Sequence, residues 1–256
     1  MNLKPQLCWM WALLMSLTVA VVPVTAQDEQ PAPETPREEE PAEDDVDIYV
    51  PPAQGAPESR VIGAVRSESS AVIELFAAMI PRQMAVTISA QPVLYVYMSH
   101  DTPHAIRLGL TNLDTFDRKL KATIPGPHKA GILAFDLAKF DITLDPHVEY
   151  EWSAVVMFDA RRPSENPFAS GWIKRIEAGE ELQAALEAGD AAAQVKALAG
   201  RGIWYDAFHR LQQAIARDPD NDKLLALRRS LLSSPAVGLD ERTSPDSRSV
   251  VERLAE

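Results

Sequence analysis

The residues best suited to bind a metal ion lie in one short stretch of the chain. His100, Asp101 and His104 fall within five residues, and imidazole and carboxylate groups are ligands that zinc accepts. Pro103 lies among them, and no fourth ligand is identifiable from the sequence. The stretch is therefore a candidate metal site with a solvated loop between two strands as the alternative, and we expect no bound cofactor.

A second group of reactive side chains lies one helical turn apart, nearer the C-terminus. Asp206 and His209 have this spacing and Tyr205 adjoins them, so they resemble an acid–base pair beside an aromatic wall. The alternative is that Trp204 packs inward while Asp206 and His209 bond to each other or to the preceding domain. Nucleophile-elbow, phosphate-loop, dinucleotide and zinc-protease motifs are missing from the sequence. Nothing in the motifs therefore argues for an enzyme.

Aromatic side chains form a third candidate site. If they were exposed, they would offer a stacking platform for a glycan or a peptide. The alternative is that these residues fill the core, as aromatic residues in strands more often do. The residues are Trp152, Trp172, Trp204, Tyr95, Tyr97 and Tyr205. We expect some of them at the contact between the strands and the helices.

The N-terminus predicts export from the cytoplasm. Lys4 precedes a continuous apolar run over residues 7–22, and Val24 to Ala26 place small residues where a signal peptidase cleaves. The run has about 16 residues, fewer than the roughly 20 that span a bilayer. Residues 1–26 are therefore interpreted as a signal peptide, with a retained anchor as the alternative. The mature chain is expected in the periplasm or outside the cell, without a stable membrane span.

Residues 27–60 are predicted to form a disordered, acidic, proline-rich linker. They contain eleven acidic residues, two basic residues and seven prolines, and such a composition buries too little apolar surface to offset the entropy of ordering. Ile48, Tyr49 and Val50 are a possible docking patch within it. Most of the net charge of −12 lies in this linker. The remainder has no basic stripe, so we expect no nucleic-acid partner.

Residues 61–176 are predicted to form an antiparallel β-sandwich of the immunoglobulin or fibronectin type III kind. Short alternating or β-branched runs separated by turn residues are typical of this fold. The runs cover residues 84–89, 93–98, 104–111, 118–124, 133–137 and 150–158. Leu144, Pro146 and Tyr150 have the spacing of the fibronectin corner, where the tyrosine hydroxyl bonds to the upstream backbone.

Residues 177–239 are predicted to form a helical subdomain, followed by a polar tail over residues 240–256. Segments rich in Ala, Leu, Gln and Glu favour helices, and they cover residues 180–188, 191–199, 203–217 and 222–232. Gly202, Ala207, Leu211, Ala214 and Pro219 resemble the second half of one tetratricopeptide repeat. Such arrays need about three stacked repeats. We therefore expect a helical hairpin docked on the sandwich.

The order of several motifs is similar to that of a bacterial family of exported proteins, domain of unknown function 928. The resemblance covers roughly residues 65–240, and the tyrosine-rich strand lacks the second proline usual after it. The matching segments are 92–97, 150–152, 171–175, 202–207 (Gly-Ile-Trp-Tyr-Asp-Ala) and 238–239. The resemblance implies export and strands followed by helices, and it implies no activity.

Three functions remain open from the sequence. The preferred hypothesis is a non-catalytic interaction module of the bacterial envelope whose partner is another envelope protein. The alternatives are a glycan- or small-ligand-binding domain that uses the tryptophans, and an unrecognised envelope enzyme. The sequence leaves the oligomeric state open.

Overall fold

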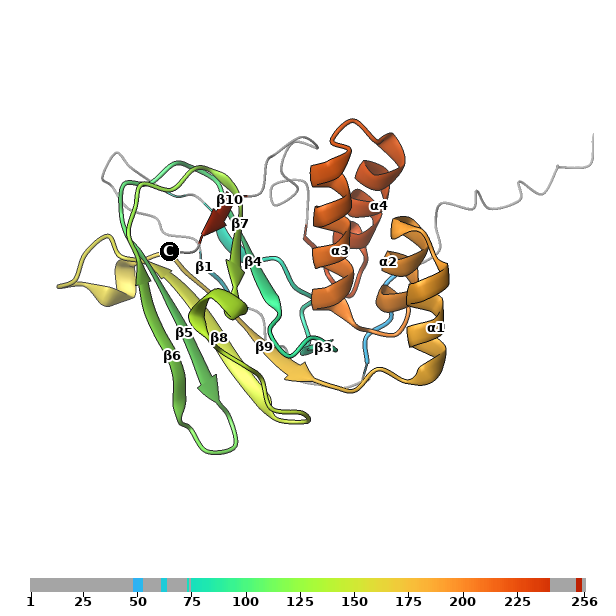
Figure 1. The fold of residues 1–256 in the computed structure, drawn as a ribbon. Helices are drawn as coiled ribbons and strands as arrows, with labels where there is room; N and C mark the ends of the chain where they lie inside the picture. Colours follow the sequence, from blue (N-terminus) through green and yellow to red (C-terminus); the bar gives the residue numbers. More distant parts are fainter. Residues whose placement is uncertain (1–47, 53–60, 64–72, 74, 240–251, 255–256) are drawn as a thin grey trace, which may run out of the picture. The chain divides into compact units, whose positions relative to one another are not determined.

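The computed structural model describes residues 48–52, 61–63, 73, 75–239 and 252–254. The predicted signal peptide, most of the predicted linker and most of the tail lie outside these residues. Strands come first and helices follow (Figure 1). The strands are β1 (Val61–Gly63), β2 (Phe76–Ala78), β3 (Ala85–Thr87), β4 (Val93–Met98), β5 (Ile106–Asn112), β6 (Arg118–Ile124), β7 (Gly131–Asp136), β8 (Glu149–Val156), β9 (Phe168–Arg175) and β10 (Glu252–Leu254). The α-helices are α1 (Glu180–Ala188), α2 (Ala191–Ala199), α3 (Trp204–Arg217) and α4 (Asp222–Ser233).

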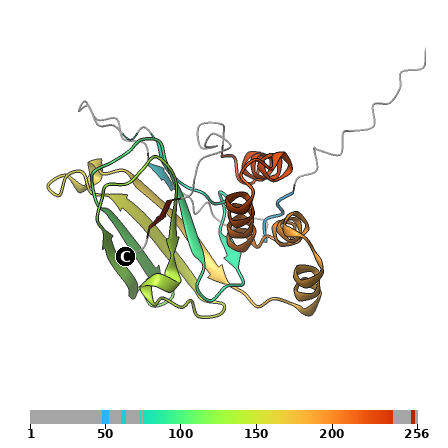
Figure 2. The same cartoon turned by 45° about the horizontal axis from the view of Figure 1, so that its top comes forward.

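The strands pair in the order β10-β7-β4-β2-β1-β9-β8-β5-β6, and β3 pairs with β9. The short β1 joins a β7–β4–β2 group to a β9–β8–β5–β6 group (Figures 1 and 2). Most pairs are antiparallel, whereas β3 runs parallel to β9 and β10 runs parallel to β7. The expected β-rich domain followed by helices is confirmed, but its strand pairing is mixed and not purely antiparallel. Likeness to immunoglobulin or fibronectin domains stays a prediction.

Side-chain alternation explains which face of each strand is buried. In β5, Ile106 and Leu108 are fully buried while Arg107 between them is exposed. In β8, Tyr150 and Trp152 face the core while Glu151 faces solvent. Because successive residues of a strand point to opposite faces, the alternating sequence pattern identified the inward residues correctly.

The corner before β8 contains the expected tyrosine contact. The backbone N–H of Asp145 donates to the Tyr150 hydroxyl at 3.2 Å, and this hydroxyl donates to the Asp145 carboxylate at 2.9 Å. Tyr150 is 1% exposed to solvent. The contact joins the turn to the strand that follows it.

Capping residues set the ends of two helices. The Asp190 side chain accepts from the N–H of Ala193 at the start of α2, and Asn221 accepts from Leu224 at the start of α4. Such caps satisfy backbone donors that the first helical turn leaves unpaired.

Within the described part of the chain, no helix has both the length and the apolar character needed to cross a membrane.

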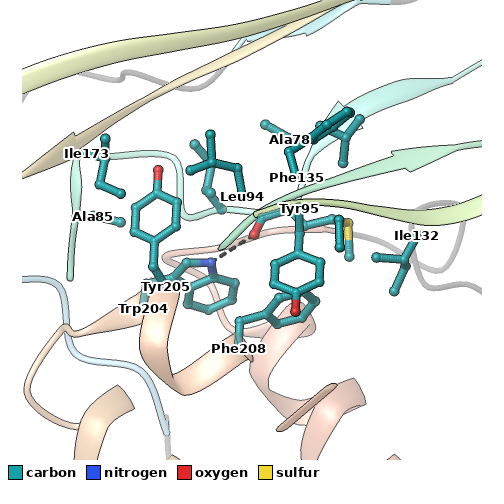
Figure 3. Packing of buried hydrophobic residues seen from close by; sticks show 14 of the residues in the cluster. Ala78, Ala85, Leu94, Tyr95, Ile132, Phe135, Ile173, Trp204, Tyr205 and Phe208 are labelled. Carbon is teal, nitrogen blue, oxygen red and sulfur yellow. Dashed lines mark hydrogen bonds between the residues drawn. The ribbon is translucent and has the colours of Figure 1, made fainter. Parts of the chain in front are cut away.

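The helix α3 joins the helical part to the strands. Trp204, Tyr205 and Phe208 point from α3 toward Leu94 and Tyr95 (Figure 3). All five belong to one buried cluster that extends from the strands into the helices. The helical part therefore shares its core with the β-rich part.

Five residues inside the predicted linker, 48–52, run beside the helices (Figures 1 and 2), with Tyr49 buried and Val50 and Pro52 exposed. Tyr49 is 1% exposed, and its ring meets Trp204 edge-on with the centroids 5.1 Å apart. The linker interpretation therefore does not extend to these residues. The acidic composition of the whole stretch predicted disorder, although the stretch includes the aromatic side chain of Tyr49. Burial of such a side chain contributes about 2 kcal/mol to the free energy of folding.

The strand β6 ends the pairing order, so one of its edges has no neighbouring strand among the described residues. Arg118, Lys119 and Lys121 are exposed along β6, whereas Leu120 and Ile124 face the core. Lysine and arginine on an edge strand discourage another chain from adding to the sheet.

Candidate functional site

The side chains of α3 approach the strands because of how the helix begins. Gly202 has a φ of +74°, a conformation that side chains disfavour. The turn at Gly202 lets the chain leave α2 and start α3 at Trp204. Residues over the first three turns of α3 then line the side of the helix that faces the strands. The polar residues that border the pocket there form what we call the α3 seam: Tyr205, Asp206, His209, Arg210 and Gln213.

Tyr205 is the buried end of the α3 seam. Its hydroxyl accepts from Trp152 Nε1 at 2.8 Å and donates to the carbonyl of Trp172 at 3.0 Å. Burial raises the pKa of Tyr205, and the hydrogen bond from Trp152 only partly opposes this. The hydroxyl stays protonated and fully paired, as a structural tyrosine requires.

The tryptophans do not form a surface platform. Trp152 and Trp204 are 0% and 1% exposed, and Trp204 Nε1 donates to the carbonyl of Met79 at 2.8 Å. Trp204 also stacks on Phe208, with their ring planes 8° apart. Only Trp172 of the three is half-buried. The core interpretation therefore applies to Trp152, Trp204 and Tyr205, because each lies where the helices meet the strands.

Asp206 binds the turn that follows β3. One of its carboxylate oxygens accepts from the Thr87 hydroxyl at 2.7 Å and from the N–H of Ile88 at 3.0 Å. Burial raises the pKa of Asp206, whereas these two hydrogen bonds act in the opposite direction. Asp206 therefore attaches the first turn of α3 to the end of β3.

His209 binds β4. Its Nδ1 and the Tyr95 hydroxyl are hydrogen-bonded at 2.7 Å, and its Nε2 lies 3.0 Å from Nε2 of Gln213. Both ring nitrogens of His209 are therefore engaged, one with a strand residue and one with a residue of its own helix. Asp206 and His209 thus both bond to strand residues, which is one of the two arrangements expected from their spacing.

A small pocket lies where α3 crosses the β3–β4 connection. Its volume is about 290 Å³. It is lined by Thr87, Ser89, Gln91, Pro92, Val93, Tyr205, Asp206, His209, Arg210 and Gln213. Sequence reasoning identified Tyr205, Asp206 and His209. It missed Arg210 and Gln213, although each lies four residues after one of these, which is the spacing of neighbours on a helix surface. The strand-side residues gave no signal, because their contact with α3 spans more than a hundred positions.

The candidate metal cluster does not converge. Asp101 pairs with Lys129 at 2.7 Å and accepts from the N–H of Ala130, and these contacts lower the pKa of Asp101. The ring of His104 packs edge-on against Phe158, with the centroids 4.6 Å apart. His100 Nδ1 bonds to the Ser99 hydroxyl. Among the residues that the structure describes, no three histidine, cysteine or acidic side chains form a group able to hold a metal ion.

A family model described as Domain of Unknown Function (DUF928) matches residues 61–245. No curated protein matches the chain. The matched region includes every strand from β1 to β9, all four α-helices and the α3 seam.

Proposed function

Because the chain belongs to the family described as Domain of Unknown Function (DUF928), whose description assigns no activity, we propose a function from the chain's own geometry. It is a non-catalytic binding module that is exported to the bacterial envelope and contacts another protein there. The observation that carries this proposal is the α3 seam: Asp206 and His209, the pair best suited to proton transfer, bond to β-strand residues and hold the helices in place.

The use of these groups favours a scaffold over a reaction centre. A general base needs an accessible proton acceptor within hydrogen-bond reach of a substrate. The Asp206 oxygen that is described above accepts from Thr87 and Ile88, and both nitrogens of His209 already have partners. Tyr205, Asp206 and His209 tie α3 to the strands, whereas Arg210 donates to Gln194 of α2. The seam therefore supports a fixed relation between helices and sheet.

The helices offer the exposed surface of such a module. Glu187 on α1 and Lys196 on α2 are exposed and make no ion pair among the described residues. Charged groups at the rim of an interface steer association and set specificity. Reversing both charges therefore tests whether a partner binds the helices while leaving the core intact.

The experiment is affinity capture from an envelope extract with the mature chain, residues 27–256. The wild-type chain is expected to retain one partner in stoichiometric amount, and the double variant Glu187→Lys, Lys196→Glu is expected to lose it. The control is Lys119→Glu on β6, which changes charge by the same kind of substitution away from the helices. Equal capture by all three chains would contradict a helical interface, and no captured protein at moderate salt would contradict the proposal.

Export is tested separately. Sequencing the N-terminus of the protein from the periplasmic fraction or culture medium is expected to start at Gln27, directly after the small residues 24–26. An intact Met1 in a membrane fraction would indicate a retained anchor. Protein recovered only from the cytoplasm would contradict export.

The pocket beside α3 supports a second candidate function, the binding of a small polar ligand. Its lining combines the side chains of Arg210 and Gln213 with the Ser89 hydroxyl and the Gln91 amide. Arg210 has one N–H bonded to Gln194 and Gln213 lies against His209, and each has further N–H donors for a ligand. A thermal-shift screen of amino acids, small carboxylic acids and sugars tests this function. A stabilising ligand whose effect disappears in Gln213→Ala would support it. A flat response across the screen would remove it.

A further inference from the structure

The segment Ile48–Pro52, here called the docked segment, is seated on the helices like a bound peptide. The N–H of Val50 donates to the carbonyl of Ala199 at 3.1 Å, and Tyr49 inserts its ring against Trp204. The two residues that hold the segment, Ala199 and Trp204, lie on either side of the turn between α2 and α3, about 150 positions after the segment in the sequence. A main-chain hydrogen bond combined with one buried aromatic side chain is a common mode of peptide recognition.

The turn between α2 and α3 is shaped to admit this segment. A Cβ atom on Gly202 would lie 2.8 Å from Cδ of Pro52 and 2.8 Å from the carbonyl oxygen of Val50. Real Cβ atoms do not come this close to other heavy atoms, so only glycine leaves room for the chain to pass. Prolines suit this path, because they lack an N–H that would need a partner and hold the chain extended. The groove therefore fits an extended segment with proline after the aromatic residue.

The docked segment fits its groove imperfectly at one atom. The hydroxyl of Tyr49 is buried and has no hydrogen-bond partner among the residues that the structure describes, and burial raises the pKa of Tyr49. A buried polar group without a partner costs free energy that an apolar replacement avoids. A peptide with phenylalanine in place of this tyrosine would therefore bind the same groove more tightly.

We propose that the groove formed by Ala199, Gly202 and Trp204 is a binding site for an extended peptide of a partner protein, in which a buried aromatic residue is followed by one exposed residue and then by proline. The exposed position is that of Val50, which is 52% exposed. The docked segment of the chain itself occupies the site until such a peptide displaces it. This inference rests on the proposed binding function and specifies the surface and the chemistry of the partner. An intramolecular occupant has an effective concentration on the order of millimolar, so it holds the site against weak competitors.

The test measures fluorescence anisotropy of a labelled synthetic peptide of residues 46–53 that carries Tyr49→Phe. The full chain with Tyr49→Ala leaves the groove open and is expected to bind the peptide at least about tenfold more tightly than the wild-type chain, because the wild-type groove is occupied. Adding Gly202→Ala to this chain is expected to abolish binding. Adding Gly179→Ala is the matched control, since a Cβ there meets nothing within 4 Å.

A second measurement keeps the test valid if Tyr49→Ala loosens the fold. Excess unlabelled peptide added to the wild-type chain is expected to speed hydrogen exchange of the Val50 amide, which loses its bond to Ala199. Equal peptide binding by the wild-type and Tyr49→Ala chains, or unchanged Val50 exchange at saturating peptide, would overturn the proposal. So would a wild-type dimer that becomes a monomer with Tyr49→Ala, since the occupant would then be a second copy of the chain.

The two proposals fail in different ways. If the Gly202→Ala chain still captures its envelope partner but does not respond to the peptide, the binding function stands and this groove is not its site. If the groove binds the peptide but no envelope protein is captured, the groove stands without the proposed partner class.

Discussion

Two tyrosines enter the same core from different parts of the chain, and their hydroxyl groups have opposite fates. Tyr205 belongs to α3, and its hydroxyl both accepts from Trp152 and donates to Trp172. Tyr49 belongs to the docked segment, and its hydroxyl is buried without a hydrogen-bond partner in the described part of the chain. Both pKa values are raised by burial. The contrast separates a permanent part of the fold, whose polar atoms are satisfied, from an occupant that a better fit can replace.

Removing the satisfied hydroxyl should have the largest effect. Tyr205→Phe leaves Trp152 Nε1 and the Trp172 carbonyl without their partner, and each unpaired buried group costs about 1–3 kcal/mol. Urea denaturation is expected to show this loss in the free energy of unfolding. Tyr97→Phe is the matched control, because the hydroxyl of Tyr97, a half-buried residue of β4, makes no hydrogen bond to another described residue. Equal stability of the two variants would contradict a structural role for the Tyr205 hydroxyl.

The same substitution in the docked segment should have the opposite sign. Tyr49→Phe removes a buried, unpaired hydroxyl and keeps the ring against Trp204, so the chain is expected to gain about 1 kcal/mol of stability. Thermal and urea unfolding measure this gain. A loss of stability would mean that the hydroxyl has a partner in solution, and the contrast between the two tyrosines would then disappear.

Asp206 is a second buried polar group of the permanent fold, and burial disfavours its ionised form. A folded pKa above the unfolded value of about 3.9 means that the folded chain binds this proton more tightly. The contribution of Asp206 to stability is therefore greatest below the unfolded pKa and falls as the pH rises through the folded pKa. Asp206→Asn keeps an acceptor oxygen for Thr87 and Ile88.

This variant should therefore gain stability relative to the wild type as the pH rises above the unfolded pKa of about 3.9. Urea denaturation at a series of pH values gives the difference between the two chains. A difference that does not change with pH, or that changes in the other direction, would show that the hydrogen bonds to Asp206 outweigh its burial.

The smallest effect is expected far from both tyrosines. Lys129 and Asp101 form an ion pair whose side chains are 76% and 57% exposed, and such pairs often contribute nothing measurable to stability. Lys129→Ala should leave unfolding unchanged while the pKa of Asp101 rises toward its ordinary value, which NMR titration follows. A clear loss of stability would show that this loop is more than a solvated connection.

The local pattern of the sequence predicted most of the secondary structure. The ranges 180–188 and 191–199 match α1 and α2, and Ala207, Leu211 and Ala214 of α3 are buried. These features depend on neighbours within a few positions. The parallel pairing of β3 with β9 and the mixed strand order depend on contacts between distant segments, and a single sequence gives no signal for them.

The candidate site was predictable to the same extent. Asp206 and His209 stood out because they share a helix face, but their partners Thr87 and Tyr95 lie more than a hundred residues away. Tyr49 was noticed as part of a possible docking patch, although the acidic composition around it favoured disorder. His100, Asp101 and His104 do not form a metal site, because residues that are close in sequence need not point toward one another. Asp101 forms an ion pair with Lys129 instead.

The basic edge of β6 has a consequence for how the protein behaves when it is concentrated. Two copies that met edge to edge would bring Arg118, Lys119 and Lys121 of each chain against the same residues of the other. Their repulsion, strongest at low salt, would keep the copies apart before backbone bonds formed. We therefore expect the chain to resist fibril growth through this strand, and its colloidal stability to fall when these three residues are replaced by neutral ones.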